Sequence, residues 1–314
     1  MRRVASPRRR VPDRRRGLKK RPVGGMFTEK SPIITQTRWT MKKFAIDGHE
    51  PSLLPDGEWK MVWNDEFDGT ELDRSKWDFR VAMMGLRHPA WVNRGVRLDG
   101  ASNVVFDLCE DGGRPVSAQL QTGYNFMDEP VTKTKFGKSA LQWNIGKLHK
   151  NLYTHKYGYY ECRCRLQQHP EAWRSAFWIQ SPVIGCSLDP GEAGAEIDVM
   201  ECFKLGEVVP HNVFSGGYGL DSKRTKVGGM DVDPKTFHRF GVLWEPTGYT
   251  FYVDGVEDGR ITEDVSHRPE FILISTEVHG YRHDDHQPVP AAYELIGKDT
   301  FVVDYVRVFD PVEN

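Results

Sequence analysis

Three acidic residues stand close together in the segment GAEIDVMECF, and their spacing could support acid–base chemistry. Glu196 and Asp198 are two residues apart and would face the same side of a β-strand, whereas Glu201 follows Glu196 by five residues and would face the opposite side. A one-residue bulge at Val199–Met200 would restore the parity and bring all three carboxylates onto one face. Without that bulge, Glu201 would be buried alone, at a cost of several kcal/mol.

Three carboxylates in one row repel each other, which raises the pKa of at least one of them. One carboxyl group can then carry a proton near neutral pH while another stays ionised, as cleavage of a glycosidic bond requires. A separation of about 5–5.5 Å between the outer two would indicate a retaining mechanism with a covalent intermediate. A solvated acidic strand or a calcium site fits the same spacing, so the residues alone leave these alternatives open.

The elements that must position this row are short strands. From about Gly57 onward, runs rich in Val, Ile, Tyr, Phe and Trp recur between Gly, Pro, Asn and Asp clusters, as in GYYECRCRL and EFILISTEV. No long stretch repeats apolar residues at i, i+3, i+4 and i+7. Many short strands with turn signals between them predict an all-β fold, a sandwich of two antiparallel sheets. We expect a single catalytic β-sandwich domain over residues 55–314, preceded at 31–54 by a linker or edge segment.

Charge is distributed unevenly along the 314 residues. Residues 1–22 hold nine Arg and two Lys against a single Asp, and the rest of the chain is acidic. Because an acidic body does not suit a phosphate backbone, no nucleic acid is expected as a partner. We interpret residues 1–30 as a disordered Arg-rich tail. The sequence contains no apolar run long enough for a membrane span and no readable signal peptide.

The motif EIDVME resembles the E-x-D-x-x-E signature of glycoside hydrolase family 16, in the bulged form of laminarinases, agarases, carrageenases and porphyranases. Five further blocks are similar to family segments and follow the family's order: WNDEFDGTELDRSKW at 63–77, KYGYYECRCRL at 156–166, WRSAFWI at 173–179, FHRFGVLWEPTGYTFYVDG at 237–255 and FVVDYVRVFD at 301–310. The resemblance implies a β-jelly-roll with a concave substrate groove. It also implies that Glu196 is the nucleophile, Glu201 the general acid and then base, and Asp198 the residue between them.

Sugar rings present flat C–H faces that bind aromatic side chains, so a polysaccharide groove should contain Trp and Tyr. Trp173 and Trp178 match the two tryptophans of the family's W-P-A-F-W segment. Their five-residue spacing puts them on opposite faces of a regular strand, and we expect Trp173 to be the sugar platform, with the role of Trp178 open. The resemblance also places Asn212 toward the sugar, and Phe214 stands where many laminarinase-like members have His.

Two departures from the family pattern involve arginine. The segment WVNRGV keeps Trp91 and Asn93 of the family's W-G-N-x-E but places Arg94 beside them, and Arg174 replaces the Pro of W-P-A-F-W. A guanidinium is a planar donor fork that suits sulfate or carboxylate. These substitutions favour a charged or galactose-based glycan over plain laminarin, with solvated surface arginines as the alternative.

No cofactor is expected to be required, although the resemblance implies a structural Ca²⁺ held in part by Asp304. A surface carboxylate with its hydrogen bonds satisfied is the alternative for Asp304. The segment STEVHGYRHDDHQ could ligate a metal, although a polar loop at the cleft rim is the preferred interpretation. The sequence therefore predicts an endo-acting retaining β-glycoside hydrolase that cleaves a polysaccharide, a galactan or sulfated algal glycan. A β-1,3 or β-1,3-1,4-glucanase and a non-catalytic lectin-like sandwich are the alternatives. We expect a secreted or periplasmic monomer whose partner is the polysaccharide.

Overall fold

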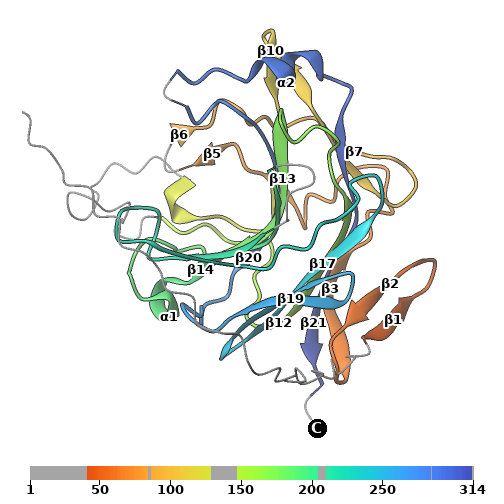
Figure 1. The fold of residues 1–314 in the computed structure, drawn as a ribbon, viewed down its shortest axis with the longest axis vertical. Helices are drawn as coiled ribbons and strands as arrows, with labels where there is room; N and C mark the ends of the chain where they lie inside the picture. The colour runs from red at the N-terminus through yellow and green to blue at the C-terminus, as the bar shows by residue number, and fades with distance from the viewer. Residues whose placement is uncertain (1–40, 84–85, 129–146, 204–209, 284, 313–314) are drawn as a thin grey trace, which may run out of the picture. The chain divides into compact units, whose positions relative to one another are not determined.

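The computed structural model describes residues 41–83, 86–128, 147–203, 210–283 and 285–312. They form two large antiparallel sheets that stack on each other (Figure 1), which confirms the predicted all-β sandwich. The predicted tail at residues 1–30 lies outside the described part of the chain. None of the described helices is long and apolar enough to cross a membrane.

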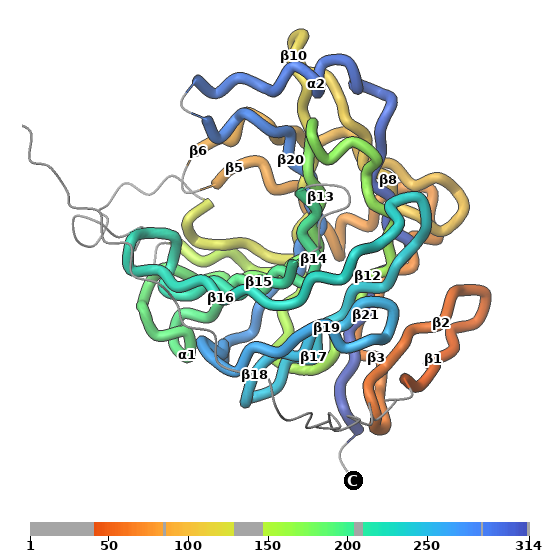
Figure 2. The backbone as a smooth tube through the Cα atoms, in the orientation of Figure 1, coloured from red at the N-terminus to blue at the C-terminus, as the bar shows by residue number. Residues whose placement is uncertain are grey.

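The first large sheet has seven strands and carries the acidic motif. Its strands curve progressively along the sheet (Figure 2). In spatial order they are β16 (Lys223–Val227), β15 (His211–Ser215), β14 (Ala195–Cys202), β13 (Trp173–Gln180), β20 (Phe271–Val278), β11 (Gln119–Gln121) and β4 (Asp78–Phe79).

The second large sheet has eight strands and packs behind the first. Seven follow one another in space: β19 (Val256–Ile261), β18 (Gly248–Val253), β17 (His238–Glu245), β12 (Gly158–Arg165), β21 (Thr300–Pro311), β8 (Val104–Asp107) and β7 (Val96–Leu98). The eighth, β3 (Trp59–Asp65), pairs with the C-terminal half of β21. Neighbours far apart in sequence, such as β12 and β21, make this a non-local topology.

Several short elements lie outside the two large sheets. They are the strand pairs β1 (Lys42–Ile46) with β2 (His49–Leu54), β5 (Ala82–Met83) with β6 (Leu86–Arg87) and β9 (Cys109–Asp111) with β10 (Arg114–Val116), the helices α1 (Pro190–Ala193) and α2 (Pro290–Glu294), and a 3-10 helix at Phe126–Asp128.

The β1–β2 hairpin lies inside the segment predicted to be a linker or edge. Phe44 packs edge-to-face on Phe309 at 5.1 Å between ring centroids, and Leu54 is buried. Arg307 donates to the carbonyl of Glu50 and to the hydroxyl of Ser52. The hairpin is therefore part of the folded unit, whose start lies before residue 55.

The core lies between the two large sheets. From β13 and β14 it receives the alternate side chains of Phe177, Ile179 and Ile197, and from the other sheet those of Val242 and Val303, all fully buried. Each such side chain contributes about 1.5–3 kcal/mol on burial. The residues between them on β13 and β14 necessarily point to the outer face, where the acidic motif lies.

Candidate active site

The pairing of β13 with β14 contains the predicted bulge. Phe177 is paired with Met200, but the next residue, Trp178, is paired with Asp198, so Val199 is the extra residue. This register confirms the bulge at Val199–Met200. Because the bulge shifts the parity by one, the side chains of Glu196, Asp198 and Glu201 all line one cavity on the outer face of the seven-stranded sheet.

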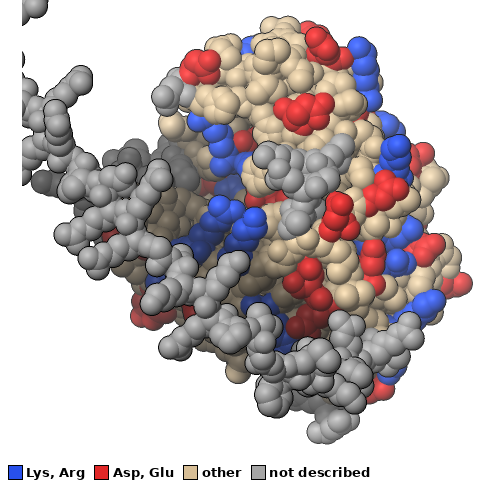
Figure 3. Space-filling model, in the orientation of Figure 1, with Lys and Arg blue, Asp and Glu red and all other residues tan. Residues whose placement is uncertain are grey.

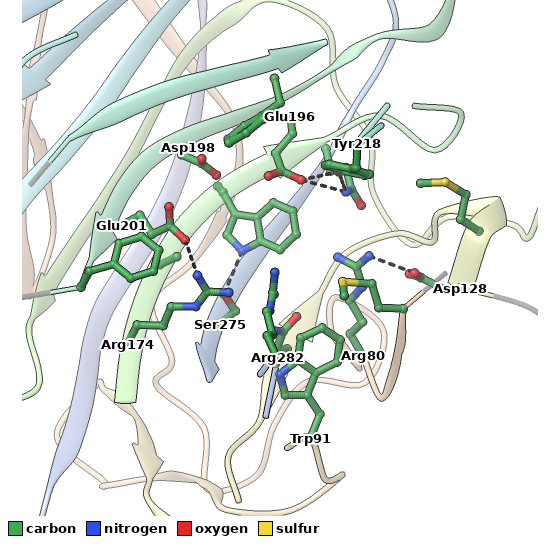
Figure 4. Close-up of a pocket in the computed structure, with 18 of the residues that line it drawn as sticks. Arg80, Trp91, Asp128, Arg174, Glu196, Asp198, Glu201, Tyr218, Ser275 and Arg282 are labelled. Atoms are coloured by element: carbon green, nitrogen blue, oxygen red, sulfur yellow. Dashed lines mark hydrogen bonds and ion pairs between the residues drawn. The ribbon is translucent and has the colours of Figure 1, made fainter. Parts of the chain in front are cut away.

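This carboxylate cavity has a volume of about 370 Å³ (Figure 4). Strands β11, β13, β14, β15, β16 and β20 contribute to it, together with loops on either side. Its lining residues are Arg80, Met83, Trp91, Gln119, Met127, Asp128, Arg174, Ala176, Trp178, Gln180, Glu196, Asp198, Glu201, Phe203, Phe214, Tyr218, Arg224, Ser275 and Arg282. Figure 3 shows basic side chains gathered in and beside a hollow in this face of the molecule.

Glu196 is held by two donors on one side of the cavity. The Tyr218 hydroxyl donates to its Oε2, and the Gln180 amide donates to the same oxygen at 3.1 Å and to the Tyr218 oxygen at 2.5 Å. Burial raises the pKa of Glu196, and these hydrogen bonds act in the opposite direction. The two donors therefore favour the ionised form that a nucleophile needs.

Asp198 lies between the other two acids and is 4% exposed. Burial raises its pKa well above the usual range, and the nearby charges of Glu201 and Glu196 raise it further. Asp198 is consequently the member of the row that most readily retains a proton at neutral pH. A protonated carboxyl group at this position relieves the repulsion between its two neighbours.

Glu201 contacts a chain of alternating charges. Arg174 donates to Glu201 at 3.1 Å and, through its other terminal nitrogen, to Glu277 at 3.1 Å. Arg282 binds Glu277 with two hydrogen bonds of 2.6 Å. Burial raises the pKa of Glu201, and Arg174 lowers it. Arg174 therefore divides its positive charge between two carboxylates, and only part of that charge acts on Glu201.

Glu277 is buried, and burial alone would raise its pKa. Arg174 and Arg282 outweigh this effect and hold the pKa of Glu277 at about 2. Of the His-rich segment that follows, His279 bonds the carbonyl of Pro170, and His286 bonds that of Tyr281. Asp284 lies outside the described residues, and no metal-ligating cluster occurs within the described ones.

Trp173 is not the sugar platform that we predicted. Its side chain is fully buried, and its Nε1 donates to Asp299 at 2.9 Å, behind the sheet. Trp178 lines the carboxylate cavity instead, and its Nε1 donates to Ser275 at 2.8 Å. The spacing correctly predicted opposite faces, but the assignment of the faces was wrong, because Trp173 shares its face with the core residue Phe177.

Trp91 and Trp178 both lie close to the guanidinium of one arginine, Arg80. The guanidinium of Arg80 is 5.9 Å from the ring centroid of Trp91 and 5.4 Å from that of Trp178, and it pairs with Asp128 at 2.9 Å. His88 stacks on Trp91 with ring centroids 4.0 Å apart, and burial lowers the pKa of His88 to about 4. The His88 ring is therefore neutral near pH 7, and the positive charge beside Trp91 and Trp178 comes from Arg80.

Asn212 and Phe214 lie on β15, next to the acidic motif of β14. Asn212 is paired with Asp198 in the sheet and is fully buried. Its Oδ1 accepts two hydrogen bonds from Arg224, of 3.1 and 2.9 Å, and the Arg224 guanidinium stacks on the Phe214 ring at 5.1 Å. Phe214 lines the cavity as predicted. Asn212 instead holds Arg224, which lines the cavity in its place.

Asn93 and Arg94 do not reach the carboxylate cavity, contrary to the prediction. Arg94 is exposed and pairs with Asp111 at 2.7 Å. Asn93 lines a separate cavity of about 520 Å³, together with Arg74 and Arg87 among others. Because each of these side chains has its own surroundings outside the acid row, neither Asn93 nor Arg94 is placed for the cleaved bond.

The residues around Asp304 do not fit a calcium ion. Its carboxylate accepts a 2.5 Å hydrogen bond from Arg163, so its charge is already paired with a guanidinium. No group of three His, Cys, Asp or Glu side chains suited to a metal occurs within the part of the chain that the structure describes. Asp304 is therefore engaged in an ion pair, and the ion pair gives no support to its predicted role as a ligand of Ca²⁺.

Several cavity residues had no signal in the sequence. Tyr218, Arg80 and Arg282 come from loops, and only folding brings them to the acid row. Gln180 could have been found, because it shares the face of Trp178 two residues before it. For Arg224, the alternating pattern of the β16 strand marks an outward position but not a contact with Asn212.

Fold and cavity together define a β-sandwich protein with a carboxylate-lined cavity on one face. The sequence profile described as Glycosyl hydrolases family 16 matches residues 126–276, which include β13, β14 and the bulge. The chain is 25% identical over 278 residues to the glucan endo-1,3-beta-glucosidase A1 of Niallia circulans, covering 79% of this chain and 37% of that protein.

It is also 24% identical over 308 residues to beta-porphyranase B of Zobellia galactanivorans, covering 90% and 95% of the two chains. Among solved structures, the laminarinase of Rhodothermus marinus has a TM-score of 0.56 at 22% identity, covering 82% of this chain and 99% of that one. The chain spans little more than a third of the glucosidase but nearly all of the porphyranase. It belongs to glycosyl hydrolase family 16, as its motifs predict.

Proposed function

We propose that the chain is an endo-acting β-glycoside hydrolase that cleaves an anionic galactan, carrying sulfate or carboxylate groups, with retention of configuration. The observation that carries this proposal is the composition of the carboxylate cavity, which is lined by a row of three acids and by four arginines. Figure 4 labels the three acids and the arginines Arg80, Arg174 and Arg282. The acids supply the chemistry, and the arginines supply the charge that a neutral glucan would not need.

In the first step, Glu201 donates its proton to the glycosidic oxygen while Glu196 attacks the anomeric carbon from the opposite face of the sugar. The bond to the leaving oxygen breaks, and a glycosyl ester of Glu196 forms. In the second step, the Glu201 carboxylate takes a proton from water, whose oxygen displaces Glu196. Two inversions at one carbon give overall retention, and both carboxyl groups return to their starting forms.

The surroundings of each acid support these roles. The donors Tyr218 and Gln180 favour the ionised form of Glu196, whereas burial raises the pKa of Glu201 toward the range of a general acid. Asp198, with the most strongly raised pKa, can donate a hydrogen bond within the row and so limit the repulsion of two negative charges.

Among the cavity arginines, Arg224 gives the most direct support to the proposal of an anionic substrate. The other three cavity arginines each pair with a carboxylate: Arg80 with Asp128, and Arg174 and Arg282 with Glu277. Arg224 is exposed and has no carboxylate partner among the described residues, while Asn212 fixes its orientation through two of its nitrogens. An oriented guanidinium with a free edge is suited to a sulfate or carboxylate oxygen.

The second candidate is a β-1,3 or β-1,3-1,4-glucanase. It is favoured by the match to the Niallia circulans glucosidase, which covers 79% of this chain. On this alternative, Arg224 would contact only neutral hydroxyl groups, and removing its charge would affect all substrates equally. A lectin-like protein without turnover has no use for a row of three carboxylates in its cavity.

The test is incubation of the purified chain with porphyran, agarose, carrageenans, laminarin and lichenan, followed by sizing of the products. We expect oligosaccharides of several lengths from a sulfated galactan and little product from laminarin. In Arg224→Ala, KM for the sulfated polymer should rise at least tenfold, the loss of about 1.4 kcal/mol, with little change for its desulfated form. Lys226→Ala, on the same strand but outside the cavity, is the control.

Laminarin as the preferred substrate would contradict the anionic proposal and favour the glucanase. Absence of turnover on the whole panel would contradict the enzymatic proposal itself. Because such polymers are too large to enter a cell, we expect the enzyme to act outside the cytoplasm.

A further inference from the structure

The carbonyl of the bulge residue has an unusual partner. His211, on β15, donates from Nδ1 to the carbonyl oxygen of Val199 at 2.6 Å. The regular pairing of β14 with β15 ends just before this point, at Asp198 with Asn212. The backbone hydrogen bonds between β14 and β15 end here, and the His211 side chain supplies the next hydrogen bond to β14. Because the Val199 oxygen can only accept, Nδ1 must carry a proton.

The ring itself is fixed from the other sheet. His211 is fully buried, and its Nε2 lies 3.1 Å from Oδ2 of Asp258, on β19. Asp258 Oδ2 also accepts from the backbone amides of Gly229 and Met230, at 2.8 and 3.0 Å. Although burial raises the pKa of Asp258, the hydrogen bonds from His211 and these amides lower it overall, so the carboxylate is ionised.

Close packing leaves the ring no alternative position. One face of His211 stacks on Phe251, with centroids 4.6 Å apart and planes 10° apart. A Cβ at Gly228 would lie 2.5 Å from the His211 ring and 2.6 Å from Asp258, so glycine is required there. Gly228 also has a φ of +73°, a conformation that glycine adopts readily.

We propose that His211, held by Asp258, is a positioning residue that fixes the β14 bulge at Val199 and thereby keeps Glu201 on the same face as Glu196. The inference rests on the proposed function, since it assigns a role in that reaction. A bulge that moved along β14 would reverse the side on which the intervening residues point. The hydrogen bond to Val199 opposes this shift, because a moved bulge would leave Nδ1–H buried without an acceptor.

Two substitutions of His211 test the roles of its two ring nitrogens separately. The amide nitrogen of Asn lies where Nδ1 lies, and that of Gln reaches toward the position of Nε2. His211→Asn therefore keeps the donor to Val199, whereas His211→Gln keeps the contact with Asp258 and loses the bulge donor. We expect kcat to fall by about 10²-fold in His211→Gln, as for a displacement of about 1 Å, with KM little changed. In His211→Asn, kcat should stay within about threefold of the wild type.

His238→Gln is the matched control, because His238 also pairs with an aspartate, Asp254, but lies outside the carboxylate cavity. It should leave kcat unchanged. Hydrogen exchange at the amides of Met200–Cys202 gives a readout that does not depend on catalysis. Exchange there should be faster in His211→Gln than in His211→Asn.

Equal kcat and equal exchange in the two His211 variants, or activity that simply follows their melting temperatures, would overturn the inference while leaving the enzymatic proposal intact. A wild-type chain without turnover would instead contradict the proposed function, and the exchange experiment would still test the bulge. If His211→Gln does not fold, the ¹⁵N chemical shifts of the His211 ring in the wild type show which ring nitrogens carry a proton, and this result tests the inference. A proton on Nδ1 is expected, and a ring protonated only on Nε2 would contradict the inference.

Discussion

Replacing Glu277 by Gln removes the carboxylate that binds Arg174 and Arg282 beside the catalytic row. Glutamine keeps the shape of the side chain but can no longer neutralise the two guanidinium groups. The substitution therefore tests whether this buried network both stabilises the fold and sets the protonation of Glu201.

The size of the effect on stability follows from the pKa of Glu277. Its value of about 2, against an ordinary 4.5, corresponds to about 3 kcal/mol of stability at pH 7. Because the folded-state pKa is lowered, this stability is present above pH 4.5 and is lost as the pH falls toward 2. We expect the melting temperature of Glu277→Gln at pH 7 to drop by roughly 6–12 °C.

The catalytic effect acts through Arg174. In the wild type, its charge is shared between Glu277 and Glu201. Without Glu277, the whole charge acts on Glu201 and lowers the pKa of the general acid. The alkaline limb of the pH dependence of kcat/KM, which reports loss of the acid's proton, should therefore move to lower pH.

The assay is denaturant unfolding at pH 7 and pH 3.5, together with a pH profile of kcat/KM for both proteins. The difference in unfolding free energy should shrink at the lower pH, because Glu277 is then largely protonated in the unfolded chain, although it stays ionised in the folded one. A variant of unchanged stability at pH 7, or an alkaline limb that stays in place or moves to higher pH, would refute this account of the network. Arg94→Ala removes an exposed ion pair outside the cavity and serves as the control.

Three further predictions follow from the cavity. Tyr218→Phe removes a donor to Glu196, so the acidic limb of the pH profile should move to higher pH, measured on the same substrate; an unmoved limb would argue against this contact. Trp178→Ala should raise KM with little loss of stability, whereas Trp173→Ala should lower the unfolding free energy by about 3–5 kcal/mol; the opposite pattern would restore Trp173 as the platform. Deleting Met200 should lower the melting temperature far more than Met200→Leu, which costs less than about 1.5 kcal/mol; equal stability of the two variants would contradict the bulged register.

The sequence was most informative where a physical conflict had one solution. Glu196 and Glu201 have opposite parity on a regular strand, and burying a lone carboxylate is so costly that a bulge was predicted, and the pairing of Trp178 with Asp198 confirms it. Alternating hydrophobic patterns likewise predicted the sandwich. Both inferences depend on neighbours along the chain, which a sequence displays directly.

Other features depended on contacts between distant segments. Trp173 and Trp178 were known to face opposite sides, yet only the second sheet defines which side is the core. Asn93 matches a family motif and Arg94 stands next to it, but both side chains lie elsewhere on the surface. Tyr218 comes close to Glu196 from a loop after β15, a contact that no local spacing encodes.

The assignment of Glu196 as nucleophile and Glu201 as acid and base is tested most directly by azide rescue of Glu196→Ala and Glu201→Ala on an activated aryl β-glycoside. With Glu196 removed, azide occupies its place and attacks the anomeric carbon once, so the product should be the α-glycosyl azide. With Glu201 removed, the ester of Glu196 still forms, and azide displaces it to give the β-glycosyl azide. The same anomer from both variants, or the two anomers exchanged between them, would contradict the assignment.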